Sequence, residues 1–177
     1  MRPLVACALT ACTVGCRAPA TTTVPLLRAA GVPVTVVTSP AVPLEVVTHT
    51  VGTEVPDPLP VEGAAVSYAD VEPALGYAIG SAVVPWAKLH RAQRPDGWRL
   101  QVDLIAGHAE YDDGRLTVTF SVRATLRARA DNDYLAQADA HCIETGRVDP
   151  RQGATVVYTC MTRLGRDLAG WLGSVEP

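Results

Sequence analysis

The chain has 177 residues, of which 48% are hydrophobic and 19% charged, and its formal net charge at pH 7 is −3. This length suits one domain with accessory segments, and the apolar share is enough for a packed core, which excludes a wholly disordered chain. The weak negative charge argues against a nucleic-acid-binding protein, which normally carries a basic surface. No apolar run reaches the length of about 20 residues that a membrane-spanning helix needs.

Residues 1–16 have the layout of an export signal. A single positive charge is followed by an apolar stretch of small residues that ends in cysteine. This looks like a bacterial lipoprotein signal, in which a peptidase cuts before a cysteine whose thiol receives lipid. Two cysteines fit that role. Cys12 has leucine at the preferred position three residues before it, whereas Cys16 gives a more credible signal length.

The parity of the cysteines favours Cys16. Cleavage before Cys16 leaves Cys142 and Cys160 as two thiols that can pair, whereas cleavage before Cys12 leaves Cys16 as an odd thiol in an oxidising compartment. We therefore predict a signal peptide over residues 1–15 and lipidation of Cys16, with Cys12 as the alternative. A plain N-terminal helix is disfavoured by Pro3 and the small residues. Acyl chains would anchor the protein firmly to a membrane, because each buried methylene contributes about 0.8 kcal/mol.

Residues 16–43 are rich in proline and threonine, a composition that blocks helix formation and predicts an extended tether. A β-branched strand is predicted over residues 44–51. After a proline-rich loop, apolar residues recur at helical spacing from about Asp70 to Arg91. Asp70 is a plausible N-cap of this helix, and Pro85 is expected to kink or split it.

Residues 98–143 show the clearest pattern, with apolar and polar residues alternating over three stretches. Asp112-Asp113-Gly114 and residues 130–133 separate the stretches and are typical of hairpin turns. This predicts three antiparallel strands with one buried and one solvated face. Residues 154–172 have apolar residues at helical spacing. The predicted order is β–α–β–β–β–α, an α+β fold in which two helices pack on one face of a twisted antiparallel sheet, as a single domain over residues 44–177.

Cys142 and Cys160 are predicted to form a disulfide. Cys142 is in phase with the buried alanines of its strand, and Cys160 falls on the buried side of the last helix. Two thiols on facing surfaces of an exported protein are expected to oxidise. The alternative is a pair of inert buried thiols. A catalytic thiol or a metal pair lacks the necessary spacing.

No pattern in the sequence predicts catalysis, a metal site or a cofactor. The histidines are scattered and form no metal-binding or catalytic motif. His108 and Glu110 share a strand face as two metal ligands would, but a solvated strand end also explains them.

Arginines gather on the solvated face of the second long strand. Arg115, Arg123, Arg127 and Arg129 are interleaved with threonines, and Arg99 of the preceding strand is expected beside them. A solvated face whose charges block aggregation explains this pattern. The alternative is a contact surface for acidic lipid headgroups or for a partner protein.

Several features occur together in this chain: a lipobox-like cysteine, a proline-rich tether, a long helix, a three-stranded meander and a terminal amphipathic helix. The nearest stretch is Trp98–Pro177, with Arg99-Leu100-Gln101-Val102-Asp103-Leu104 and then Gly114-Arg115-Leu116-Thr117-Val118. This pattern resembles the auxiliary lipoproteins of ABC-type transport and lipid-trafficking systems. It includes no diagnostic motif, so no functional residue is carried over. The resemblance implies a non-enzymatic envelope protein whose fold contacts a transport partner.

The expected function is therefore that of a non-catalytic, lipid-anchored envelope protein that docks onto a larger assembly. Its expected contacts are a membrane, through the N-terminal lipid, and an envelope protein, with no nucleic acid. Arg17 after the preferred cysteine is compatible with outer-membrane sorting, so the expected location is the outer membrane, facing the periplasm. The alternative is a carrier that binds a lipid or small molecule in an apolar cleft between helices and sheet. An enzyme is the least favoured class.

Overall fold

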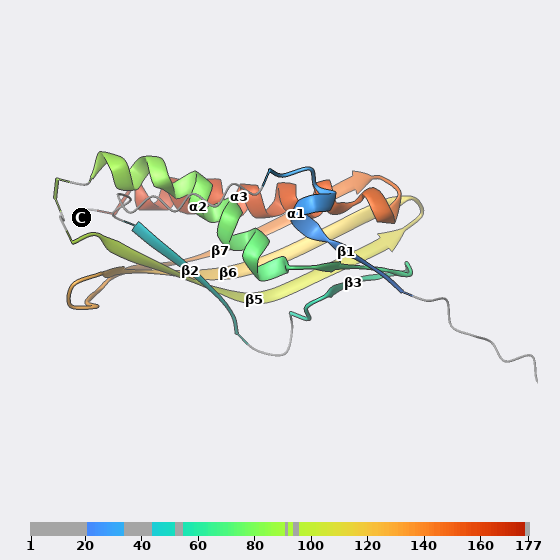
Figure 1. The fold of residues 1–177 in the computed structure, drawn as a ribbon, viewed down its shortest axis with the longest axis horizontal. Helices are drawn as coiled ribbons and strands as arrows, with labels where there is room; N and C mark the ends of the chain where they lie inside the picture. The colour runs from blue at the N-terminus through green and yellow to red at the C-terminus, as the bar shows by residue number, and fades with distance from the viewer. Residues whose placement is uncertain (1–20, 34–43, 52–54, 91, 94–95, 176–177) are drawn as a thin grey trace, which may run out of the picture.

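The computed structural model describes residues 21–33, 44–51, 55–90, 92–93 and 96–175. The elements in chain order are β1 (Thr22–Pro25), α1 (Leu26–Ala29), β2 (Leu44–Thr50), β3 (Leu59–Glu62), β4 (Val66–Ala69), α2 (Val71–Leu89), β5 (Trp98–Asp112), β6 (Arg115–Ala128), β7 (Tyr134–Arg147), η1 (Pro150–Gln152) and α3 (Ala154–Leu172). The described strands form one seven-stranded sheet, and the helices lie on one side of it (Figure 1). Among the described residues, no helix is long and apolar enough to cross a bilayer.

The longest strands of the sheet form the meander β5–β6–β7, in which β7 is an edge strand. β6 pairs antiparallel with both neighbours over almost its whole length. Alternate residues of β6 are buried beneath the helices, and most of those between them are partly or fully exposed. The alternation in the sequence thus predicted these three strands and their buried face correctly.

The predicted antiparallel sheet is only partly right, because the sheet is mixed. β2 runs parallel to the first half of β5, from Leu44↔Trp98 to Thr50↔Leu104. β3 runs parallel to the second half of β5 along the same edge. Parallel strands need a long crossover, which α2 supplies between β2 and β5. The predicted order β–α–β–β–β–α also lacked β1, β3, β4 and α1.

A β-bulge divides β5 between the segments that pair with β2 and with β3. The register with β6 shifts between Leu104 and Ala106. Leu104 is fully buried before the shift and Ala109 after it, so the buried phase moves from even to odd positions. An extra residue in one strand produces this change of phase. An alternation continued unchanged through the bulge would therefore assign the second half of β5 to the wrong face.

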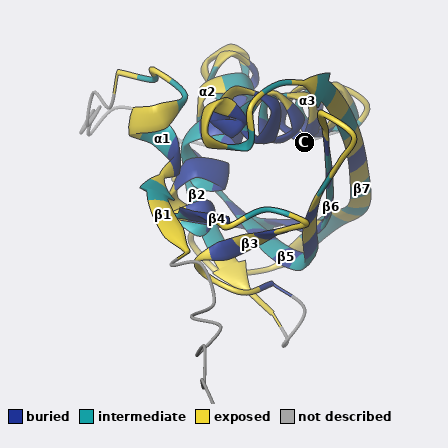
Figure 2. Ribbon diagram, turned by 90° about the vertical axis from the view of Figure 1, so that its right-hand side faces the viewer, coloured by how far each residue is buried: buried dark blue, intermediate teal, exposed yellow. Residues whose placement is uncertain are grey.

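Helices α2 and α3 cover the concave face of the sheet (Figure 2). The interface holds large side chains with no exposed surface, among them Ile79 from α2, Phe120 from β6 and Leu164 from α3. The two helices approach closely at Gly165, where an added Cβ would lie 3.0 Å from the carbonyl oxygen of Ala78. α2 continues through Pro85 to Leu89.

The start of α2 differs from the expected capping. Asp70 has a left-handed backbone (φ 63°), and its side chain forms no capping hydrogen bond. The carboxylate of Glu72 instead accepts hydrogen bonds from the backbone N–H and the hydroxyl of Thr50, at 3.1 and 2.9 Å. Glu72 therefore ties the first turn of α2 to the end of β2.

Part of the segment predicted as a tether packs against the domain. β1 lies at the edge of the sheet, parallel to β4, from Thr22↔Val66 to Pro25↔Ala69. Leu26 at the start of α1 is fully buried in the core. The two cysteines considered for lipidation, Cys12 and Cys16, lie outside the described residues.

Candidate functional site

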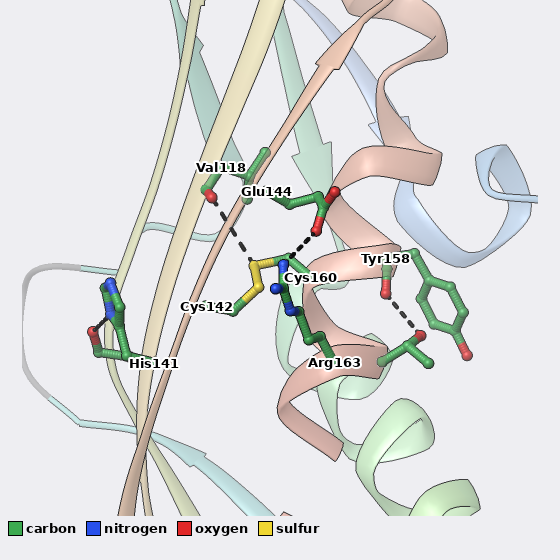
Figure 3. Close-up of a disulfide and its surroundings, with 9 residues drawn as sticks. Val118, His141, Cys142, Glu144, Tyr158, Cys160 and Arg163 are labelled. Carbon is green, nitrogen blue, oxygen red and sulfur yellow. Dashed lines mark hydrogen bonds and ion pairs between the residues drawn. A yellow bond between two sulfur atoms is a disulfide. The ribbon is translucent and has the colours of Figure 1, made fainter. Parts of the chain in front are cut away.

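Cys142 and Cys160 form the predicted disulfide, which joins β7 to α3 (Figure 3). Their Cα atoms are 5.7 Å apart, and both residues are almost completely buried, with exposures of 2% and 0%. On the solvent side, Arg163 of α3 donates a hydrogen bond to Glu144 of β7 at 3.1 Å. The end of the meander is thus fastened to the last helix by a covalent bond and an adjacent ion pair.

The side chain next to Cys142 points away from the helices. Cys142 faces α3, and His141 lies on the other side of β7 (Figure 3). There, His141 Nδ1 is 2.9 Å from the hydroxyl of Ser121 on β6. The disulfide and this polar pair belong to opposite faces of the same strand, as the period-two alternation of a strand requires.

The face of the sheet turned away from the helices is the candidate functional surface, which we call the open face. It is built from the odd-numbered residues of β6 and β7 with their neighbours on β2 and β5. The cross-strand rows are Glu45–Arg99–Arg127, Val47–Gln101–Thr125–Gln137, His49–Asp103–Arg123–Asp139 and Thr119–Ile143. Most members are polar, and Ile143 is an exposed apolar side chain among them.

The arginines predicted as a contact surface do gather here, but carboxylates accompany them. Arg99 lies 3.0 Å from Glu45, and Arg129 lies 3.9 Å from the same carboxylate. Arg123 is 2.9 Å from Asp139, and this hydrogen bond raises the pKa of the guanidinium. The positive charge of this part of the open face is therefore locally balanced.

The remaining two arginines of that set differ from these. Arg127 donates to the backbone carbonyl of Asn132 at 3.1 Å. Arg115 makes no ion pair within the described part of the chain, and its cross-strand neighbours are Asp112 on β5 and Arg147 on β7. The open face thus presents both signs of charge over most of its length. This pattern complements the surface of a protein better than it complements the uniformly negative phosphates of lipid headgroups.

The histidines do not assemble a metal site within the described ranges, where no group of three metal-ligating side chains occurs. His108 Nδ1 lies 3.7 Å from Glu62 of β3, and both side chains are largely exposed. The strand pattern predicts Glu110 as the neighbour of His108 and gives no sign of Glu62, because Glu62 belongs to β3, in a segment whose prolines predict a loop. Ser121 and His141 are in contact, as the serine and histidine of a catalytic triad would be. The nearby carboxylate of Asp139, however, accepts its hydrogen bond from Arg123.

Two buried contacts, one hydrogen bond and one pair of aromatic rings, were not predicted. Tyr68 of β4 donates a hydrogen bond to the backbone carbonyl of Pro150, and burial raises the pKa of its phenol to about 12, so it remains a donor at neutral pH. Trp86 of α2 packs on Trp98 of β5, with ring centroids 5.1 Å apart. Both contacts join residues far apart in the sequence, and no local pattern signals them.

Comparisons with known proteins give a likeness of fold. No family model and no curated protein sequence matches the chain. A solved structure from Xanthomonas campestris, assigned to the family DUF330, is similar with a TM-score of 0.50 and 17% identity, over 77% of this chain and 90% of that one. A "putative lipoprotein" from Caulobacter crescentus has a TM-score of 0.45 and 15% identity over 76% and 93% of the two chains. A hypothetical protein from Chlamydia trachomatis has a TM-score of 0.45 and 12% identity over 73% and 95%. The first of these shows that this chain shares its α+β fold with the Xanthomonas protein.

Proposed function

We propose that the protein is a non-catalytic, lipid-anchored component of the bacterial cell envelope that docks onto a protein assembly, such as an ABC-type transport system, through the open face of its sheet. Its proposed location is the outer membrane, facing the periplasm. The observation that carries the proposal is the disulfide between Cys142 and Cys160. Structural disulfides persist in exported proteins and are rare in the reducing cytosol. Because the bond is buried, it has a structural role in the fold and is not an exposed redox pair.

The docking part of the proposal is supported by the one-sided placement of the helices. α2 and α3 bury one face of the meander, and no helix in the described part of the chain lies on the open face (Figure 1). That face combines fixed ion pairs such as Arg123–Asp139 with the exposed side chain of Ile143. Protein–protein contacts typically combine apolar side chains with polar and charged groups.

The carrier alternative requires a cleft between the helices and the sheet. The structure fills that region with side chains that have no exposed surface, including Trp98, Phe120 and Met161. No observation in the described part of the chain favours the carrier over the docking protein.

The anchor is tested by the substitution Cys16→Ala, with Cys12→Ala as the matched control. The unchanged protein, expressed in its bacterial host, is expected to float with membranes and to have the mass of a chain that begins at an acylated Cys16. Cys16→Ala should move the protein to the soluble fraction without acyl mass, and Cys12→Ala should change neither property. Membrane flotation of the Cys16→Ala variant at the level of the unchanged protein would contradict the proposal.

The docking face is tested by placing a photo-crosslinking amino acid at Gln137 in living cells. Gln137 is exposed on the open face, and Thr159 is exposed on the solvent side of α3. A probe at Gln137 is expected to give one discrete adduct with an envelope protein, identified by mass spectrometry. The same probe at Thr159 should not give that adduct. Equal adducts from both positions, or none from Gln137, would argue against docking through this face.

A further inference from the structure

We infer that one end of the domain lies against the membrane surface and that the opposite end points away from it. This inference rests on the proposed lipid anchor at Cys16. The near end consists of Thr22 with the β3–β4 turn (63–65) and the β5–β6 turn (112–114). The far end consists of the β6–β7 turn (129–133).

The length of chain between the anchor and the domain sets the first limit. Thr22, where β1 begins, is six positions after Cys16. Six residues in fully extended form span about 20 Å. An acylated Cys16 would therefore hold Thr22 within about that distance of the lipid headgroups.

Backbone contacts place both turns of the near end at the same end of the sheet as Thr22. The N–H of Thr22 donates to the carbonyl of Ala65 in the β3–β4 turn at 2.9 Å. β3 then pairs with the last part of β5 through Val61↔Ala109 and Glu62↔Glu110. The β5–β6 turn follows directly. Figure 1 shows the start of β1 and these two turns at one end of the sheet, and the β6–β7 turn at the other.

The dimensions of the sheet separate the two ends. β6 runs from the near end to the far end with 14 residues, which at about 3.4 Å per residue extend over roughly 45 Å. The sheet is thus about twice as long as the chain that would tether it. The attachment point lies at one end of this long axis, so the far end is the part of the domain least able to reach the bilayer.

The charges at the near end do not by themselves determine this orientation. Arg115, Arg147 and Arg151 lie at this end, together with the acidic residues Glu62, Glu110, Asp112, Asp113 and Asp149. The five carboxylates outnumber the three guanidinium groups, so charge does not attract this end of the domain to an anionic lipid surface. The short connection between Cys16 and Thr22 determines that the near end lies against the membrane. The surface in contact with that end is the lipid layer that holds the acyl chains.

The orientation also leaves the open face accessible. The strands of the meander would run away from the bilayer, so the rows that contain Gln137 and Asp139 would face sideways along the envelope. A protein partner in the same membrane could then approach this face without removing the domain from its anchor.

Two alanine positions provide a matched test. Ala65 in the β3–β4 turn and Ala130 in the β6–β7 turn are both exposed. Each is replaced by cysteine (Ala65→Cys or Ala130→Cys) in the lipidated protein and labelled with a small fluorophore, while Cys142 and Cys160 remain paired and unreactive. The variants are reconstituted in phosphatidylethanolamine/phosphatidylglycerol vesicles that contain a lipid with a nitroxide on its headgroup. We expect severalfold stronger quenching at position 65 than at position 130.

A longer connection tests whether tether length is the cause. A Gly/Ser insertion of about 20 residues between Arg17 and Ala18 adds a flexible chain with a root-mean-square length of about 25 Å. This insertion should remove most of the difference between positions 65 and 130 while the protein still floats with the vesicles.

The outcomes separate the inference from the proposed function. Equal quenching at the two positions, or stronger quenching at position 130, in protein that floats with vesicles would overturn the orientation and leave the anchor standing. Protein that carries no acyl mass and does not float would overturn both. A difference that persists unchanged with the long insertion would show that something other than the connection orients the domain, which also contradicts the inference.

Discussion

Removal of the disulfide is expected to lower the free energy of unfolding by about 3 kcal/mol. The bond closes a loop with a sequence separation of 18 residues, and the loss of chain entropy in the unfolded state gives a stabilisation of about this size. The loop contains the end of β7, η1 and the first part of α3 up to Cys160, so the reduced chain must bring a strand and a helix together without a covalent link.

The measurement is urea denaturation of a soluble chain that starts at Arg17, with and without reductant. The double substitution Cys142→Ala and Cys160→Ala serves as the control, because reductant should leave its unfolding curve unchanged. A thiol assay on the folded, unreduced protein should find neither cysteine reactive. Two reactive thiols, or a midpoint that does not move on reduction, would contradict the role assigned to this bond.

The parts of the fold that sequence analysis predicted are those with a long local pattern. β5, β6 and β7 have 15, 14 and 14 residues, so period-two alternation is repeated many times before a turn interrupts it. In α3 the helical spacing of apolar residues likewise repeats without interruption over 19 residues. The disulfide followed from these phases, because knowing which side of β7 and which side of α3 are buried places both sulfur atoms in one interface.

The missed elements are short and depend on distant partners. β1, β3 and β4 have four residues each, and two of them contain proline, Pro25 in β1 and Pro60 in β3. Proline normally argues against a strand and is tolerated at sheet edges. The pairing of β1 with β4 joins residues more than 40 positions apart. No local periodicity contains that information, so the proline-rich segment 16–43 was predicted to be a tether, although β1 and α1 within it pack against the domain.

The candidate surface shows the same division. The gathering of arginines followed from the phase of β6, since Arg115, Arg123 and Arg127 share its odd positions. The ion pairs that neutralise Arg123 and Arg99 did not follow from this phase, because they depend on register. Asp139 meets Arg123 only through the pairing of β6 with β7, and Glu45 meets Arg99 only through the parallel pairing of β2 with β5. Local pattern thus predicted where the charges lie, and tertiary pairing determined their net effect.

The close contact between α2 and α3 leads to the second large expected effect, the response to Gly165→Leu. A Cβ at position 165 would lie 3.0 Å from the carbonyl oxygen of Ala78 and 3.1 Å from the Cβ of Ala82, so a leucine cannot fit without pushing the helices apart. Overpacking of this kind costs typically 1–3 kcal/mol and sometimes more, and here we expect a loss of about 3 kcal/mol.

Gly170 in the same helix is the matched control. A Cβ at position 170 would meet no atom within 4 Å, and the residue is exposed. Leucine is a better helix former than glycine by about 0.8 kcal/mol, so intrinsic propensity alone predicts that Gly165→Leu and Gly170→Leu both stabilise α3. The close approach of the helices instead predicts effects of opposite sign, with Gly170→Leu slightly stabilising and Gly165→Leu strongly destabilising. Urea denaturation at equal m-values measures the difference. Equal stability of the two variants would mean that α2 and α3 are not in contact at Gly165. The one-sided packing of the helices, which leaves the opposite face of the sheet open, would then lose its main support.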